Sequence, residues 1–359
     1  MVNVQEWVEE IEEHLGEIFC LTFVKDVDET EALRRMGGLA DTFGARKLEE
    51  LRGEAESFDA GYPQGAAALR VGAWTVVIEA DGSEGSDRDL MAAVSRGTQA
   101  VVVQRHNYAS HTIGHTVDGE LLVYYNSDWP EGSWVTPPDH LLTAVREAGL
   151  EPRPVYEADI SPPTAGLMFA NRVTGVSLTV PMLAEPLPSA HLEPWFAATS
   201  IQLLDAYADR ELAEAVEAAG PRLQRAVATE EIMRLAAVSG ASDIPGLAEA
   251  LTAAAEGNSE PIRDDSALGH RVRRWLADSR RAGNSLNDHW ARYRMSDADR
   301  HRAFLLGWLA QALRGALSHD PRTAALGALR PLMDGPSPLR DPDRRAAVLD
   351  LLRQEWAAS

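Results

Sequence analysis

The sequence predicts an α+β domain followed by an all-helical domain. Up to about residue 185, short runs of β-branched and aromatic residues alternate with single helical patterns, whereas only helical patterns follow residue 194. Four prolines lie between residues 181 and 194, and the length of 359 residues exceeds what one core usually holds. We therefore expect an acidic α+β domain over 1–185, a proline-rich linker over 186–193 and a helical domain over 194–359.

The first domain is expected to begin with a helix, a strand and a second helix. Apolar residues at helical spacing over residues 4–15 predict an amphipathic helix that Gly16 ends. The run 18–24 is too short and too rich in β-forming residues for a helix, so it predicts a strand. A second helix follows over residues 28–36 and ends in a glycine pair.

Six predicted strands with hairpin connections indicate a mostly antiparallel sheet with helices on one face. The clearest signal is Asp118-Gly119, a pair favoured in type I′ turns because both central residues need positive φ. Ser86 with Asp89 three residues later indicates a capped helix between the hairpins. The expected strands cover residues 18–24, 67–71, 74–79, 100–104, 112–117 and 120–125.

The second domain is expected to hold about eight helices and no repeat of fixed period. The first of them is predicted over residues 194–207. The clearest follows Ser296, where apolar side chains from Phe304 to Leu313 lie on one stripe.

Charge and cysteine content restrict the function. Of the net charge of −21, residues 1–190 carry −18 (31 acids, 13 bases) and residues 191–359 carry −3 (24 acids, 21 bases). An acidic surface repels phosphate backbones, so nucleic acid is not expected to bind the first domain, and the expected partner is a protein or a small ligand. Cys20 is the single cysteine, and no run reaches the roughly 20 apolar residues of a membrane span. We expect a cytoplasmic protein without a membrane contact.

Candidate binding residues gather where the strand 74–79 runs into an acidic, glycine-containing loop. Carboxylates at this position can perform acid–base chemistry or hold a cation. Sequence motifs for a nucleophile elbow, a phosphate-binding loop or a dinucleotide site are absent, so no catalytic residue is assigned and the question of an enzyme stays open. The candidate residues are Glu79, Asp81, Arg105, His106 and His111.

Three histidines, His106, His111 and His115, raise the question of a metal site. His111 and His115 are four residues apart on a predicted strand, which separates them by about 13 Å and prevents both from binding one zinc ion. The loop after Glu79 lacks the ligand spacing of a calcium loop. We expect neither a metal nor a cofactor.

Basic and aromatic residues are interspersed in the helical domain between residues 261 and 302, a segment that contains ten basic and six acidic residues. Such a pattern can bind single-stranded nucleic acid, can dock on the acidic domain, or can form a solvated face with internal ion pairs. The candidate basic patch consists of Arg271, Arg273, Arg274, Arg280 and Arg281.

Six short blocks in a fixed order resemble an uncharacterised bacterial family, the domain-of-unknown-function family 6461, over residues 1–185. The blocks are FCLTFV (19–24), LRRMG (33–37), WTVVIE (74–79), SRGT (95–98), DGEL (118–121) and RVTGV (172–176). The loop over residues 81–85 differs from the Trp-containing form usual in that family. The resemblance implies no activity and no catalytic residues, and no family is recognised for the helical half.

Three hypotheses follow for the function. The first is a non-enzymatic binding or protein-interaction module, in a role such as bacterial defence, toxin immunity or signalling. The second is a hydrolase-like enzyme that uses Glu79, Asp81 and His106. The third is a regulator whose Arg-rich helices contact nucleic acid.

Overall fold

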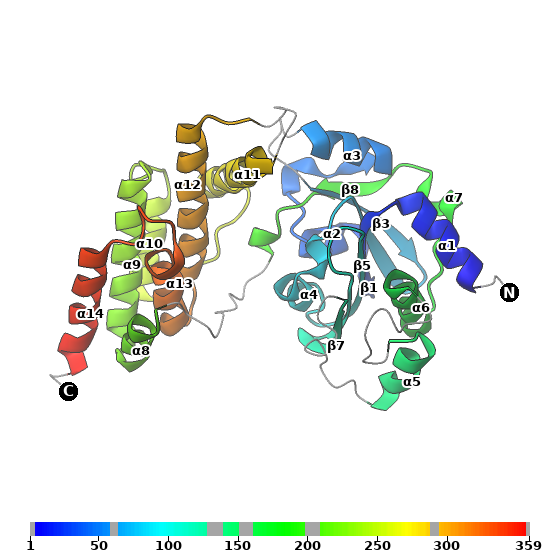
Figure 1. Ribbon diagram of the computed structural model, residues 1–359, viewed down its shortest axis with the longest axis horizontal. Helices are drawn as coiled ribbons and strands as arrows, with labels where there is room; N and C mark the ends of the chain where they lie inside the picture. Colours follow the sequence, from blue (N-terminus) through cyan, green and yellow to red (C-terminus); the bar gives the residue numbers. More distant parts are fainter. Residues whose placement is uncertain are drawn as a thin grey trace. The chain divides into compact units, whose positions relative to one another are not determined.

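The computed structural model describes residues 4–57, 64–127, 139–150, 161–197, 209–287 and 294–356. The chain forms two compact units, residues 1–199 and 200–359 (Figure 1). The first is an antiparallel sheet with helices and the second is all-helical, which confirms the predicted fold class. Among the described residues, no helix is both long and apolar enough to cross a membrane.

Eight strands form one open sheet in the order β2-β8-β3-β4-β1-β5-β6-β7, and all neighbouring strands are antiparallel. All six expected strands are present. Asp118 and Gly119 both have positive φ in the turn between β6 and β7, as the turn type requires. The bounds are β1 Ile18–Lys25, β2 Gly44–Arg46, β3 Gly65–Val71, β4 Trp74–Ala80, β5 Gln99–His106, β6 Thr112–Val117, β7 Glu120–Asn126 and β8 Leu187–His191.

Strand β8 lies inside the segment 186–193 that the prolines predicted as a linker. It pairs with β3 through Ala190 opposite Ala66 and with β2 through Pro188 opposite Ala45. A five-residue strand that contains a proline has little sequence signal of its own, because proline removes a ladder donor. The division between the two units accordingly falls at residue 199, not within 186–193.

Helices cover both faces of the sheet, whereas the strand pattern predicted one covered face. Val76 and Ile78 face a core with α1, α3, α5 and α6, and Val77 faces a second core with α2 and α4. Trp74 to Glu79 are all buried, as is typical of a strand covered on both sides. The helices of this unit are α1 Val4–Leu15, α2 Glu29–Arg35, α3 Leu48–Ser57, α4 Arg88–Val94, α5 Asp139–Glu147, α6 Pro162–Thr174 and α7 Val180–Leu183, and the 3₁₀ segments are η1 Ala40–Thr42, η2 Glu84–Ser86 and η4 Pro194–Phe196.

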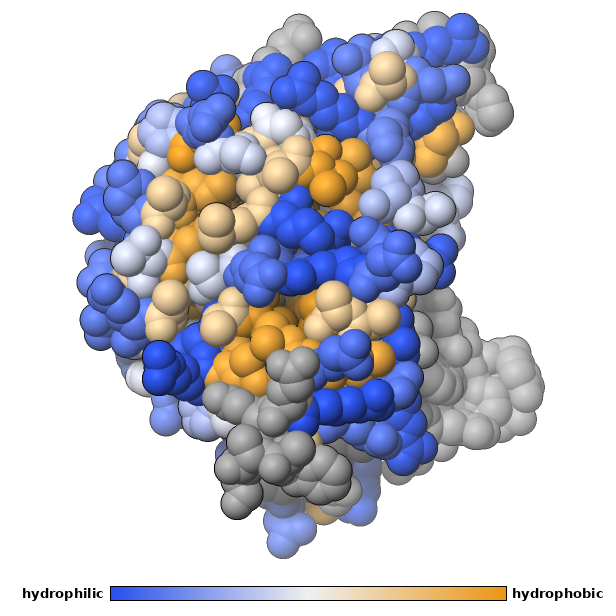
Figure 2. All heavy atoms as spheres, turned by 90° about the vertical axis from the view of Figure 1, so that its left-hand side faces the viewer, coloured by the Kyte–Doolittle hydropathy of each residue, from blue (hydrophilic) through white to orange (hydrophobic). Residues whose placement is uncertain are grey.

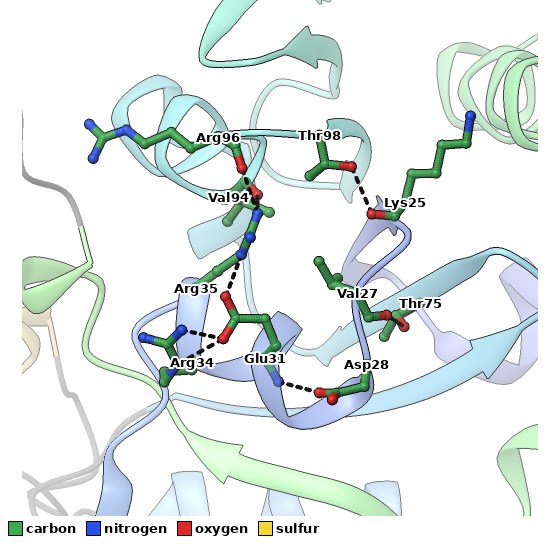
Figure 3. A network of polar contacts seen from close by, with 10 residues as sticks. All are labelled: Lys25, Val27, Asp28, Glu31, Arg34, Arg35, Thr75, Val94, Arg96 and Thr98. Atoms are coloured by element: carbon green, nitrogen blue, oxygen red, sulfur yellow. Dashed lines mark hydrogen bonds and ion pairs between the residues drawn. The ribbon is translucent and has the colours of Figure 1, made fainter.

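A polar network ties α2 to the C-terminal end of α4 (Figure 3). Nη1 of Arg35 donates to the carbonyl oxygens of Val94 at 3.0 Å and Arg96 at 2.8 Å, and its Nε donates to Glu31 at 2.7 Å. Burial opposes ionisation of Glu31, but the hydrogen bonds from Arg35 and Arg34 outweigh it and lower the pKa of that carboxyl. The guanidinium thus satisfies carbonyls that a helix end leaves without partners.

The helical unit contains seven α-helices among its described residues. The predicted helix 194–207 lies mostly outside the described residues, since only 194–197 are described and form η4 with the residue after it. Helices α12 and α13 approach closely at Gly315 and Gly327, where a Cβ on either residue would meet the other backbone at 2.7 Å. The helices are α8 Arg210–Ala218, α9 Pro221–Val238, α10 Leu247–Glu256, α11 Ala267–Asn287, α12 Asp297–Ala316, α13 Pro321–Asp334 and α14 Pro342–Trp356.

The surface of the helical unit has apolar areas on the face seen in Figure 2. Hydrophobic side chains gather there in two patches separated by a hydrophilic band.

The interior of the helical unit contains a buried charge: the carboxylate of Glu231 is fully inaccessible and is paired with Arg234 at 2.6 Å and Arg344 at 3.1 Å. The pair with Arg344 joins α14 to α9, whereas Arg234 lies on α9 itself.

Candidate functional site

The turn between β5 and β6, residues 107–111, presents an aromatic side chain to solvent. Tyr108 is 78 % exposed, and its hydroxyl donates to Oε2 of Glu17 at 2.7 Å. The acceptor carboxylate, and then its negative charge, raise the pKa of the Tyr108 hydroxyl. Nitrogen of Asn107 also donates to the carbonyl oxygen of Glu17 at 3.2 Å, so the turn is attached to the start of β1.

Two imidazoles shape this turn by accepting backbone hydrogen bonds. The amide of Tyr108 donates to Nδ1 of His106 at 3.2 Å, and the amide of His106 donates to Nδ1 of His111 at 3.3 Å. A ring nitrogen that accepts carries no proton, so both rings are assigned as neutral with the proton on Nε2. The His106 ring also meets the Tyr108 ring edge-on, with centroids 6.3 Å apart.

Arg105 belongs to the opposite face of the sheet. It lies directly across from Phe19 of β1, whose side chain is in the core with α1 and α6. Its Nη1 is 3.6 Å from Glu12 of α1, and its Nε donates to Oδ1 of Asn107 at 3.1 Å. Burial raises the pKa of Glu12 and outweighs the opposite effect of the guanidinium. Arg105 therefore contacts the turn, through Asn107, from the face of the sheet that α1 covers.

Glu79 is closed off from solvent. Its carboxylate is fully buried and accepts the amides of Glu84 and Gly85, each at 2.8 Å, so that it pins the segment η2 over the sheet. A Cβ at Gly85 would lie 2.9 Å from this carboxylate and 3.1 Å from Sγ of Cys20, so only glycine fits there. Burial is the main cause that raises the pKa of Glu79 to about 7, and the charge of Glu84 adds to it.

The thiol of Cys20 lies beside that carboxylate and is completely buried. Burial, followed by the negative charge of Glu79, raises the pKa of the thiol well above its ordinary value. A thiol in this environment stays protonated and unreactive.

Asp81 stands at the surface next to the turn. Its backbone has a positive φ of 67°, its amide donates to the carbonyl oxygen of Ile18 at 3.0 Å, and its carboxylate is 3.1 Å from Nε of Arg52. Since Ile18 is also the partner of His106 across β1 and β5, Asp81 and His106 flank the same residue.

The structure brings some of the sequence-predicted residues together and separates others. His106 and His111 are in contact and Asp81 lies at the same end of the sheet, on the other side of β1, while Arg105 lies on the opposite face. Glu79 shares a face with His106 but stands two strands and two residues away, about 12 Å between Cα atoms at ordinary sheet spacing.

Tyr108 and Glu17 are not among the residues predicted from the sequence. An aromatic residue in a polar turn between two strand patterns is the signal that could have identified Tyr108. The partnership with Glu17 joins residues 91 positions apart, so it depends on strand order.

His115 is buried against α6. It is 2 % exposed, its Nε2 lies 3.3 Å from Oε1 of Gln99, and its ring meets Phe169 of α6 edge-on. Burial is the main cause that lowers the pKa of this imidazole to about 4. In the part of the chain that the structure describes, no group of three or more metal-ligating side chains is found.

The five arginines of the candidate basic patch differ in burial along α11. Arg271 and Arg274 are exposed, and Arg274 is 3.3 Å from Asp278. Arg273 is only 6 % exposed, while Arg280 and Arg281 are half-buried. The helix therefore offers two exposed guanidinium groups, one of them in an ion pair.

The first unit is thus an acidic α+β module built on one antiparallel sheet with helices on both faces. Residues 5–187 match the model of a family described as "Family of unknown function (DUF6461)", and the chain belongs to this family. This match confirms the resemblance seen in the sequence, and no family covers the C-terminal part. No curated protein and no solved structure matches the chain.

Proposed function

We propose that the protein is a cytoplasmic, non-enzymatic binding protein, and that the turn 107–111 of its first unit contacts a cationic segment of a partner protein. The observation that carries the proposal is the exposure of Tyr108, an aromatic side chain whose hydroxyl and backbone are both held in place. Tyrosines of this kind supply large contact area at low entropic cost and are enriched among the residues that dominate binding energy.

Charge favours a cationic partner. Exposed carboxylates of Glu13, Glu17 and Asp81 lie on the elements around the turn, in a half of the chain with a net charge of −18 (31 acids, 13 bases over residues 1–190). An arginine of the partner could stack on the Tyr108 ring and pair with Glu17. Steering by the overall negative charge would speed the encounter.

The hydrolase-like alternative receives less support from the geometry. Both oxygens of Glu79 accept hydrogen bonds from backbone amides of its own loop, and the side chain has no exposed surface. A general acid or base has to reach the proton that it transfers. Glu79 is better explained as the residue that fixes η2 over the sheet.

The test uses a fluorescein-labelled deca-arginine peptide and anisotropy measurements on the full chain. We expect binding that weakens with salt, and a 5- to 30-fold weaker affinity in Tyr108→Ala, which corresponds to about 1–2 kcal/mol. Val117→Ala is the matched control, because Val117 is an exposed apolar residue at the far end of β6. Equal affinity in both variants would show non-specific attraction and would refute the proposal. A labelled single-stranded oligonucleotide that binds more tightly than the peptide would favour the nucleic-acid hypothesis.

A further inference from the structure

We propose that the turn 107–111 is a pH-responsive element, in which neutral His106 and His111 accept backbone amides of the turn and their protonation frees the amide of Tyr108. The consequence for binding depends on the proposed function, because Tyr108 is the side chain assigned there to the partner. The structural part of the inference depends only on the hydrogen bonds of the turn.

The two bonds form a chain through the turn. The amide of Tyr108 requires an acceptor at Nδ1 of His106, and the amide of His106 requires an acceptor at Nδ1 of His111. A protonated imidazole carries hydrogen on both ring nitrogens, so each amide would then face a donor. Protonation of both rings removes both hydrogen bonds and places two positive charges within the same turn.

Three other hydrogen bonds of the hairpin join backbone and hydroxyl atoms and not the rings. The amide of His111 donates to Oγ of Ser127 at 2.8 Å, the amide of Ser127 donates to the carbonyl oxygen of His111 at 3.0 Å, and Ala109 donates to the carbonyl oxygen of His106 at 3.1 Å. Strands β5, β6 and β7 therefore stay paired, and the change is confined to the turn.

Several charged groups lie on the elements at this end of the sheet and on the helix and 3₁₀ segment packed against it. They are Glu17 at the start of β1, Asp81 at the end of β4, Glu84 in η2, Arg105 on β5 and Glu12 on α1. Ordinary carboxylates and guanidinium groups keep their charge between pH 5 and 8, whereas imidazole titrates in this range. Glu79, whose pKa is about 7, titrates in the same range, so the experiment has to separate its effect from that of the histidines.

The experiment is an NMR titration of the full chain from pH 8 to pH 5.5 with ¹⁵N-labelled histidine and tyrosine, which gives ten and seven residues to assign. At pH 8 the ring nitrogens of His106 and His111 should report the Nε2–H tautomer. The backbone amide signal of Tyr108 should then shift with the same midpoint as the His106 ring.

Asparagine variants provide the decisive comparison. In the double variant His106→Asn, His111→Asn, the side-chain oxygens occupy the δ1 positions, accept the amides of Tyr108 and of residue 106 and cannot be protonated, so the Tyr108 signal should stay at its pH 8 position throughout. His115→Asn is the matched control: this histidine lies on the same hairpin but contacts Gln99, and the titration of Tyr108 should be unchanged. Glu79 is retained in both variants, so it cannot cause a difference between them.

Two results would overturn the inference: an Nδ1–H tautomer of His106 at pH 8, or a Tyr108 titration that persists in the double variant. The peptide assay separates this failure from failure of the proposed function. A turn that titrates as expected, together with equal peptide affinity in Tyr108→Ala and Val117→Ala, would keep the pH-responsive turn and refute its role in binding.

Discussion

Replacing Arg35 with alanine should destabilise the first unit much more than replacing its neighbour Arg34. Both side chains hydrogen-bond to Glu31, but Arg35 also donates to two carbonyl oxygens at the end of α4 (Figure 3). The Arg35 side chain is 24 % exposed and that of Arg34 is 68 % exposed. The pair of variants therefore compares the same change at adjacent positions with different burial.

The hydrogen bonds set the expected magnitudes. Bonds with one charged partner contribute about 1.5–3 kcal/mol each, toward the low end where the group is partly exposed. Loss of two such bonds from Arg35 should lower the free energy of unfolding by about 3 kcal/mol. Arg34→Ala removes an exposed ion pair and should cost about 0–1 kcal/mol.

Urea denaturation followed by circular dichroism measures both values, provided that the m-value is unchanged. High salt should reduce the effect of Arg34→Ala and leave most of the effect of Arg35→Ala, because bonds to carbonyl oxygens are less screened than an exposed ion pair. Equal losses in the two variants would refute the argument that Arg35 joins α2 to α4.

Four further predictions concern titration, packing and domain limits. The folded-state pKa of Glu79, about 7, lies above its ordinary value of 4.5, so its stabilising contribution is full below pH 4.5 and is lost as pH rises through 7. The resulting fall in the free energy of unfolding is about 3 kcal/mol. Unfolding curves measured across that pH range should no longer show this fall in Glu79→Gln. The pKa of His115 is lowered from 6.5 to about 4, so its contribution to stability is full above pH 6.5 and is lost as pH falls through 4. The free energy of unfolding of His115→Gln should therefore fall less in acid than that of the unmodified protein. An unchanged dependence on pH would contradict burial of His115 as a neutral ring. Ile78→Ala should cost about 2–5 kcal/mol in thermal or urea unfolding, since the side chain has no exposed surface. A fragment of residues 1–197 should melt cooperatively, whereas one of residues 1–185 lacks β8 and should melt lower; equal melting temperatures would show that β8 is dispensable.

Local patterns in the sequence were sufficient for the fold class and for most strands. Once the strand 74–79 is recognised, the period of two along a strand puts Val76 and Ile78 on one face and Val77 on the other, and the structure has them so. The Asp118-Gly119 pair fixed its turn through positive φ at both residues. Six blocks of residues were enough to identify the family.

Only the tertiary structure decided which faces are covered and what each polar side chain contacts. Strand β8 exists because β3 offers it a partner from more than a hundred residues earlier in the chain, and its own residues carry almost no strand signal. From the sequence, Glu79 is the last residue of a strand beside an acidic loop, yet in the structure η2 folds back over its carboxylate and donates two amides. His106, His111, Tyr108 and Glu17 become one site because strand order places the start of β1 beside the end of β5. Such contacts depend on which distant strands are neighbours, and a local pattern of residues does not contain that information.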